Sequence, residues 1–199
     1  MRDDAIGSTR LGHYGVAGTG VALAEATIAA AWNVQGDPAR SPFLEETHRL
    51  FGVALPLAPN TTARRARRAA LWLGPASWLL VGGAAPSFAE YAAARDALNA
   101  AGAALFDVSA SRVAWTLSGP HATDVLAKGC PLDLHPRAFA AGACAQSLYL
   151  HVNVLIEKRD DAPTFAVMVA RSFARDVWHA LCKASAQYGY EVRAPARFA

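Results

Sequence analysis

Apolar residues recur at every second position in several short stretches of the chain and at helical spacing in others. Ile28, Trp32 and Val34 alternate with smaller or more polar residues, which is typical of a strand with one buried face. Pro42 and Gly52 bound a segment of helical spacing, since proline suits a first helical turn and glycine a helix end. Up to residue 108 the pattern predicts a strand, a helix, a two-stranded hairpin, a helix and a strand, over residues 27–34, 41–52, 71–73 with 78–81, 86–101 and 104–108.

The second half of the chain predicts nearly the same order of elements. Val113, Trp115 and Leu117 form an alternating strand pattern, and the small residues and proline of 118–120 predict that a helix begins directly after it. Two strands, a helix and a last strand follow, over residues 147–157, 165–169, 172–188 and 190–193. The alternation within 147–157 predicts one strand with Leu148, Leu150, Val152, Val154 and Ile156 on one face and Tyr149, His151, Asn153 and Leu155 on the other.

The matching order of elements indicates a duplication. Two of the predicted helices also begin alike, with Ser87-Phe88-Ala89 and Ser172-Phe173-Ala174. We therefore predict an α+β fold of two ferredoxin-like β-α-β-β-α-β halves, residues 25–108 and 109–193, which share a sheet-and-helix core in a single domain over 25–199. Residues 1–24 are rich in glycine and alanine and show little periodicity, so we expect them to form an extended or poorly ordered lead-in.

Composition and charge narrow the classes of function. Hydrophobic residues make up 53% of the 199 residues and charged residues only 18%, which predicts surface buried against partner chains, although an alanine-rich composition also explains the figures. A net charge of +3 does not favour a nucleic-acid partner. The one basic run, Arg64 to Arg68, is expected to be a solvated loop, or otherwise a contact for an acidic partner surface.

The cysteines and the apolar runs predict a cellular location. Cys130, Cys144 and Cys182 are odd in number and have no CxxC spacing, which indicates reduced thiols in a cytoplasmic protein. The first residues lack the pattern of a secretory leader, and no apolar run reaches the length of about 18 residues that suggests a membrane span. We expect a soluble protein of the cytoplasm with no membrane partner.

No catalytic, cofactor-binding or metal-binding residue can be assigned from these patterns. The glycines of 15–20 do not follow a predicted strand and lack the spacing of a dinucleotide-binding loop. His179 and Cys182 lie one helical turn apart, but a metal needs three or four ligands and none of the other histidines, His13, His48, His121, His135 and His151, shares this spacing. Ser109 and Ser111 are expected to be turn residues, and Asp107 is expected to accept hydrogen bonds from backbone donors at the junction of the two halves.

Several motifs occur in an order and at spacings that resemble the gamma subunit family of heterotetrameric sarcosine oxidase. The most specific are Leu117-Ser118-Gly119-Pro120-His121-Ala122 and Lys128-Gly129-Cys130-Pro131-Leu132-Asp133-Leu134-His135. Further matching segments are residues 71–80, 107–113, 139–146 and 171–175, so that the resemblance covers about 25–190. It implies a relationship to the folate-binding fold of the glycine-cleavage aminomethyltransferases.

The resemblance also implies a role in one-carbon metabolism. Such an oxidase demethylates sarcosine to glycine, produces hydrogen peroxide, and releases the one-carbon unit as formaldehyde or as 5,10-methylenetetrahydrofolate. This chain would be its small, structural and non-catalytic subunit beside larger alpha and beta subunits and a small delta subunit. FAD, FMN, NAD and tetrahydrofolate would be bound by those partners and none by this chain.

Departures from related families weigh against catalysis by this chain. Aminomethyltransferases carry an acidic pair at the start of the strand that corresponds to 154–156, whereas Asn153 and Val154 stand there in this chain and an amide cannot relay a proton. Asp160 and Asp161 lie farther along, in a turn that we expect to be solvated. A related iron–sulfur family shares the sequence Lys-Gly-Cys, but the residues that follow it there differ from those of this chain. A folate-binding, aminomethyltransferase-like protein and an interaction module of another N-methyl amine oxidase remain as alternatives.

Overall fold

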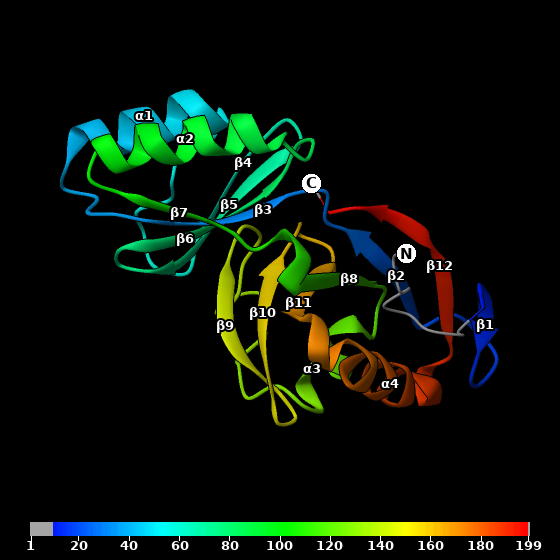
Figure 1. Cartoon of the computed structure of the whole chain (residues 1–199). Helices are drawn as coiled ribbons and strands as arrows, with labels where there is room; N and C mark the ends of the chain where they lie inside the picture. The colour runs from blue at the N-terminus through cyan, green and yellow to red at the C-terminus, as the bar shows by residue number, and fades with distance from the viewer. Residues whose placement is uncertain (1–9, 199) are drawn as a thin grey trace. The chain divides into compact units, whose positions relative to one another are not determined.

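The computed structural model describes residues 10–198 and divides the chain into two compact units (Figure 1). One unit is residues 28–110. The other combines the described residues up to Thr27 with Ser111–Phe198. Residues 1–9 of the expected lead-in lie outside the described residues.

Residues 28–110 form a five-stranded antiparallel sheet with two helices. The elements are β3 (Ala31–Gln35), α1 (Ser41–Phe51), β4 (Thr62–Arg65), β5 (Arg68–Gly74), β6 (Ser77–Gly82), α2 (Phe88–Ala100) and β7 (Ala104–Asp107). The strand order is β4-β5-β6-β3-β7. Without β4 this is the order fourth, first, third, second of a ferredoxin-like unit, so the predicted β-α-β-β-α-β half is confirmed and one edge strand is added.

Helices α1 and α2 lie side by side over one face of this sheet (Figure 1). Every second side chain of β3, β5, β6 and β7 points to the face of the sheet that the helices cover. The core of the unit forms where the apolar sides of the helices pack against these side chains. The fully or nearly buried residues of this core include Trp32, Val34, Phe43, Phe51, Ala70, Trp78, Leu80, Leu98 and Leu105.

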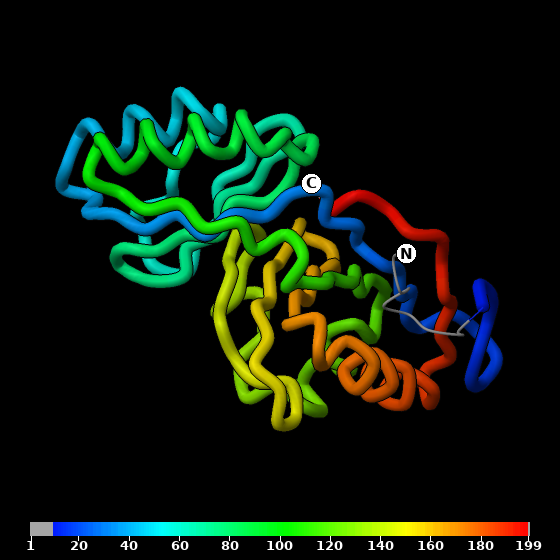
Figure 2. Tube along the Cα trace, viewed as in Figure 1, coloured from blue at the N-terminus to red at the C-terminus, as the bar shows by residue number. Residues whose placement is uncertain are grey.

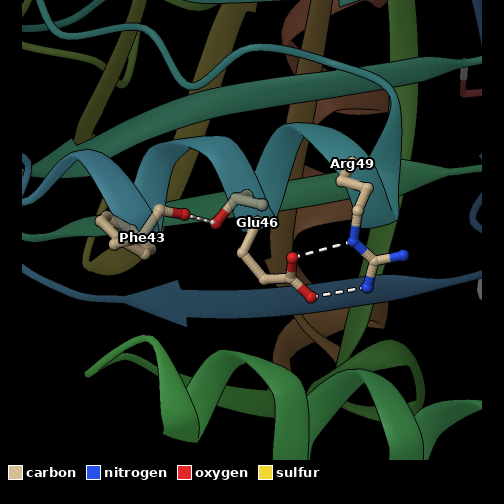
Figure 3. Close-up of polar contacts among 4 residues, drawn as sticks. Phe43, Glu46 and Arg49 are labelled. Atoms are coloured by element: carbon tan, nitrogen blue, oxygen red, sulfur yellow. Dashed lines mark hydrogen bonds and ion pairs between the residues drawn. The ribbon is translucent and has the colours of Figure 1, made fainter.

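Helix α1 combines a buried polar bond with an exposed ion pair. The Thr47 hydroxyl is buried and donates to the Phe43 carbonyl, 2.8 Å away and one turn earlier. On the exposed side, the Arg49 guanidinium donates two hydrogen bonds of 2.6 and 2.8 Å to the Glu46 carboxylate (Figure 3). This bidentate bond lowers the pKa of Glu46. Gly52, with a φ of +65°, ends the helix as the sequence predicts.

The second unit contains a seven-stranded sheet and two helices. Its elements are β1 (Gly12–Tyr14), β2 (Val21–Thr27), β8 (Arg112–Ser118), α3 (Ala122–Ala127), β9 (Cys144–Tyr149), β10 (Val152–Lys158), β11 (Phe165–Ala170), α4 (Ala174–Ser185) and β12 (Tyr190–Arg197), with short 3-10 helices at Arg171–Phe173 and Ala186–Tyr188. A further 3-10 helix, Ser109–Ser111, contains the point of the chain at which the two units divide. The strand order is β1-β12-β2-β8-β11-β10-β9. The pair β2 with β12 is parallel and the other pairs are antiparallel.

This larger sheet follows the same plan as the smaller one. β8, β10, β11 and β12 take the places of β3, β5, β6 and β7, and β9 extends the edge beside β10 as β4 does beside β5. The larger sheet differs in two added strands: β2 lies between β12 and β8, and β1 pairs with the other edge of β12. Figure 2 shows how the chain places β2 beside the last strand. Helices α3 and α4 pack on the sheet, and Trp178 and Leu181 of α4 share a core with Val21, Leu23, Trp115, Leu117, Tyr149, Ile156 and Val167 of the strands.

Strand β2 was not predicted, since it begins inside the expected lead-in and the predicted strand over 27–34 starts only at Ala31. Val21 and Leu23 are fully buried and alternate with Ala22 and Ala24. Alanine has low strand preference, so the pattern is weak by itself. Hydrogen bonds to two flanking strands supply what the local sequence lacks.

The prediction of one strand over 147–157 is wrong. The chain turns at Leu150-His151, so that β9 and β10 form a tight hairpin in which Tyr149 pairs with Val152. Residues that pair directly point to the same face, and Tyr149 is therefore buried with Val152, whereas Leu148 and Leu150 are 41% and 54% exposed. Leu150 takes a φ of +56°, a conformation for which leucine gives no sequence signal.

Candidate functional site

Asp107 and Ser109 have a structural role at the end of β7. The Asp107 carboxylate accepts hydrogen bonds from the Ser109 backbone N–H at 2.9 Å and from its hydroxyl at 2.6 Å. The Ser109 oxygen also accepts from the Ala31 N–H at 2.9 Å, so it ties the end of β7 to the start of β3. The interpretation of Asp107 as an acceptor for backbone donors is confirmed.

His179 and Cys182 do not form a metal site. His179 is exposed on α4, whereas Cys182 is half-buried, and burial raises the pKa of its thiol to about 11. The thiol is therefore protonated near neutral pH and is a poor ligand and nucleophile. Among residues 10–198 no group of three or more histidine, cysteine or acidic side chains could hold a metal ion.

Asn153, which stands where the resemblance to aminomethyltransferases implies an acidic residue, is an exposed amide. Asn153 lies on β10, where it pairs with the exposed Leu148 of β9. Asp160 and Asp161 are exposed in the turn between β10 and β11, as expected from the sequence. Neither the amide nor these solvated carboxylates provide a buried acid or base.

Sequence reasoning missed a pair of buried charges at the end of β10. Glu157 is 1% exposed and Lys158 is 3% exposed, although Glu-Lys-Arg-Asp-Asp is typical of a solvated turn. The Lys158 ammonium donates to the Ala162 carbonyl and lies 4.7 Å from the centre of the Phe165 ring. Burial lowers the pKa of Lys158, and the nearby Asp160 and Asp161 oppose that shift. These contacts hold the β10–β11 turn on its strands.

The motif around Lys128-Gly129-Cys130 joins α3 to the β9–β10 hairpin. The Gly129 carbonyl accepts from the Leu150 N–H at 2.7 Å, and a Cβ at residue 129 would lie 3.0 Å from the Tyr149 ring. Glycine is therefore needed for this close approach. The Cys130 thiol is buried and donates to the Ser147 hydroxyl at 3.6 Å. The residues that carry the resemblance thus serve packing.

Another part of this motif region packs α3 against the end of α4. The His121 ring stacks on the Tyr188 ring with 4.4 Å between centroids, and its Nδ1 lies 2.8 Å from an Asp124 carboxylate oxygen. The Lys128 ammonium lies over the same tyrosine ring at 4.5 Å and also bonds to the Ala184 carbonyl. The lysine cation, the two rings and the carboxylate therefore interact with one another in this region.

The smaller unit contains a cavity of about 360 Å³ on its helical side. It lies where the end of α1, the β6–α2 loop and the first turns of α2 meet the sheet. Its lining residues are Trp32, Leu50, Phe51, Arg68, Ala84, Ala85, Pro86, Glu90, Tyr91, Ala94 and Leu105. Apolar and aromatic walls with few polar groups are typical of small-molecule sites.

Arg68 behaves differently from the rest of the basic run. Arg64, Arg65 and Arg67 are exposed as expected, but the run forms the β4–β5 hairpin and not the loop that was predicted. Arg68, the first residue of β5, lines the cavity and donates from Nη1 to the Phe51 carbonyl. The alternation of a strand is the only sequence signal for this position of Arg68, because residues two apart share a face and Ala70 is buried.

The duplicated ferredoxin-like order defines the class of fold as that of the aminomethyltransferases. The chain superposes on glycine cleavage system aminomethyltransferase T from Bartonella henselae with a TM-score of 0.60 at 15% identity, over 89% of this chain and 48% of that one. This likeness shows the fold. None of the described helices is long and apolar enough to cross a membrane.

Sequence comparison identifies the family within that class. The model of the sarcosine oxidase, gamma subunit family matches residues 35–187, and the chain belongs to this family. Sarcosine oxidase subunit gamma of Corynebacterium sp. (strain P-1) is 33% identical over 177 residues, which are 88% of this chain and 84% of the relative. That of an Arthrobacter species is 36% identical over 107 residues, 53% of this chain and 52% of the relative.

A solved assembly agrees with this assignment. The chain superposes on a chain of the heterotetrameric sarcosine oxidase from Corynebacterium sp. U-96, crystallised in complex with pyrrole 2-carboxylate, with a TM-score of 0.77 and 30% identity. The match covers 87% of this chain and 88% of that one. The resemblance found in the sequence is confirmed.

Proposed function

We propose that this chain is the gamma subunit of a heterotetrameric sarcosine oxidase and that its role in the complex is structural. The near full-length match to a chain of such a heterotetramer carries the proposal. The complex would oxidatively demethylate sarcosine to glycine, with hydrogen peroxide and either formaldehyde or 5,10-methylenetetrahydrofolate as further products.

The arrangement of polar side chains supports a structural role. Asp107 and Ser109 are bound to backbone groups, Asn153 is an exposed amide, and the thiol of Cys182 has a raised pKa. Asp107 and Ser109 are therefore engaged in turn hydrogen bonds, the Asn153 amide cannot relay a proton, and the Cys182 thiol is protonated near neutral pH. Alpha, beta and delta partner subunits would carry the FAD, FMN, NAD and tetrahydrofolate sites. Three free cysteines support a location in the cytoplasm.

Co-purification tests the assembly. The tagged chain, coexpressed with candidate alpha, beta and delta subunits, is expected to elute with them as one complex of equal stoichiometry. A chain that stays monomeric and never binds these subunits would contradict the proposal. Heat on titration of the isolated chain with tetrahydrofolate would instead favour the folate-binding alternative.

The non-catalytic role needs a separate measurement on the assembled complex. Asn153→Ala and Cys182→Ser are expected to leave kcat for sarcosine oxidation within about twofold of the unsubstituted complex, since neither side chain would contact a reacting atom. A loss of about a hundredfold in kcat with intact assembly would assign catalysis to this chain.

A further inference from the structure

The cavity of residues 28–110 has one cationic group that is held rigidly at its wall. Arg68 donates from Nη1 to the carbonyl of Phe51, the last residue of α1. A Cβ at Gly83 would lie 3.2 Å from Arg68 Nε, and one at Gly52 would lie 3.5 Å from Nη1. Both glycines take positive φ values, +79° and +65°, which let the chain pass this close to the guanidinium. The side chain is therefore fixed between α1 and the β6–α2 loop.

Arg68 is also the group of the cavity that has unused hydrogen-bond donors. The Glu90 carboxylate accepts from the Ser87 N–H and hydroxyl in the capping box of α2. The Tyr91 hydroxyl donates to the Leu105 carbonyl at 3.0 Å and accepts from the Asp107 N–H at 3.3 Å. A guanidinium has five N–H donors, of which Phe51 takes one, so Arg68 retains donors in the paired geometry that suits a carboxylate.

The rest of the wall favours a flat apolar body attached to that carboxylate. Trp32 and Phe51 contact each other with 5.3 Å between ring centroids, and Tyr91, Ala94 and Leu105 complete an aromatic and aliphatic lining. Ring faces and edges of this kind pack well on another aromatic ring. A volume of about 360 Å³ is at the lower end for small-molecule sites, which indicates a ligand of modest size.

We propose that this cavity binds a small aromatic or similarly flat carboxylic acid, with the carboxylate on Arg68 and the apolar body against Trp32 and Phe51. The site belongs to this chain and does not depend on assembly with partner subunits.

Binding of 4-fluorophenylacetate to the full-length chain, followed by ¹⁹F NMR line broadening, tests the proposal. We expect saturable broadening with a dissociation constant at or below about 1 mM. The uncharged 2-(4-fluorophenyl)ethanol and the cationic 4-fluorophenethylamine are expected to bind at least about tenfold more weakly. Equal binding of all three probes, or no broadening up to about 10 mM acid, would overturn it.

Substitutions locate the binding. Arg68→Gln is expected to weaken binding of the acid at least about tenfold, while Arg67→Gln, next to it in the hairpin, changes it by less than about twofold. Because Arg68→Gln also removes the bond to Phe51, Ala94→Leu provides a second variant that fills the cavity and leaves Arg68 intact. It too is expected to abolish broadening. Unchanged binding in Ala94→Leu would contradict the assignment.

Discussion

Trp78 and Trp115 are both fully buried, one in each unit, and they differ in the state of the indole N–H. Trp78 Nε1 donates to the Pro56 carbonyl at 2.7 Å and so ties the loop after α1 to β6. Trp115 Nε1 has no acceptor among the described residues, although its ring packs on that of Trp178 with 6.0 Å between centroids. One tryptophan therefore combines packing with a hydrogen bond, and the other contributes packing alone.

Replacing each tryptophan by phenylalanine is expected to separate these contributions. Both changes remove the same apolar volume, but Trp78→Phe also leaves the Pro56 carbonyl without its donor. We expect Trp78→Phe to lower the free energy of unfolding by about 1 kcal/mol more than Trp115→Phe. Urea unfolding followed by circular dichroism measures both values. Equal losses, or a larger loss for Trp115→Phe, would show that the indole bond contributes nothing.

Local sequence predicts the type of element in which a residue lies better than it predicts whether the side chain is buried. Arg64, Arg65 and Arg67 are exposed, as the basic run predicts. Arg68 instead lines a cavity, because it is the first residue of β5 and the alternation of the strand points its side chain toward α1. Glu157 and Lys158 are buried by neighbouring strands and by the chain around Phe165. A charged residue is expected to be exposed unless the tertiary structure provides interaction partners for its side chain.

Helices α2 and α4 show how far similar sequences can differ in local structure. Ser87 is the N-cap of α2, and its hydroxyl accepts from the Glu90 N–H at 3.3 Å while the Glu90 carboxylate accepts from the Ser87 N–H at 2.7 Å. The matching Ser172 lies inside a 3-10 turn, and α4 begins after Phe173 without a side-chain cap. The shared Ser-Phe-Ala start is therefore not a shared cap.

Ser87→Ala and Ser172→Ala form a matched pair. Loss of the cap is expected to lower the free energy of unfolding by about 1 kcal/mol in Ser87→Ala, since an orphan N–H of the first turn loses its acceptor. Ser172→Ala is expected to change it by less than about 0.5 kcal/mol. Chemical denaturation of the two variants gives the comparison. A cost in Ser172→Ala as large as that in Ser87→Ala would mean that the two serines are equivalent.

Apart from β4, the order of elements was predictable in residues 28–110 because their main boundaries carry a signal. Proline and glycine bound α1, and Pro75 and Ala76 form the turn between β5 and β6. The β9–β10 hairpin has no such residue, since its turn is Leu150-His151 and its alternation continues without a break. A turn without glycine, proline, asparagine, aspartate or serine forms because the two strands that it connects pair with each other, and a local sequence pattern carries no information about that pairing.

The described residues form a duplicated plan into which one strand is inserted. Five strands of each unit follow the same order, β2 enters the larger sheet between β12 and β8, and β1 is added at its edge. The place between β12 and β8 is occupied by residues from the start of the chain, so the larger unit is built from two segments that are far apart in sequence. Its sheet is complete only when β2 has paired on both edges, and the segment expected to be a lead-in is one of its central strands.

Leu23 tests the importance of this inserted strand. It is fully buried at the middle of β2, pairs with Val192 on one side and with Leu117 on the other, and belongs to the core under α3 and α4. Leu23→Ala is expected to lower the free energy of unfolding by about 2 to 5 kcal/mol, because it leaves a cavity in the core between the sheet and helices α3 and α4. Leu11→Ala is the matched control, since Leu11 is 60% exposed, and we expect a change below about 0.5 kcal/mol. Urea unfolding measures both, and a cost for Leu23→Ala no larger than that of the control would mean that β2 is dispensable to the sheet.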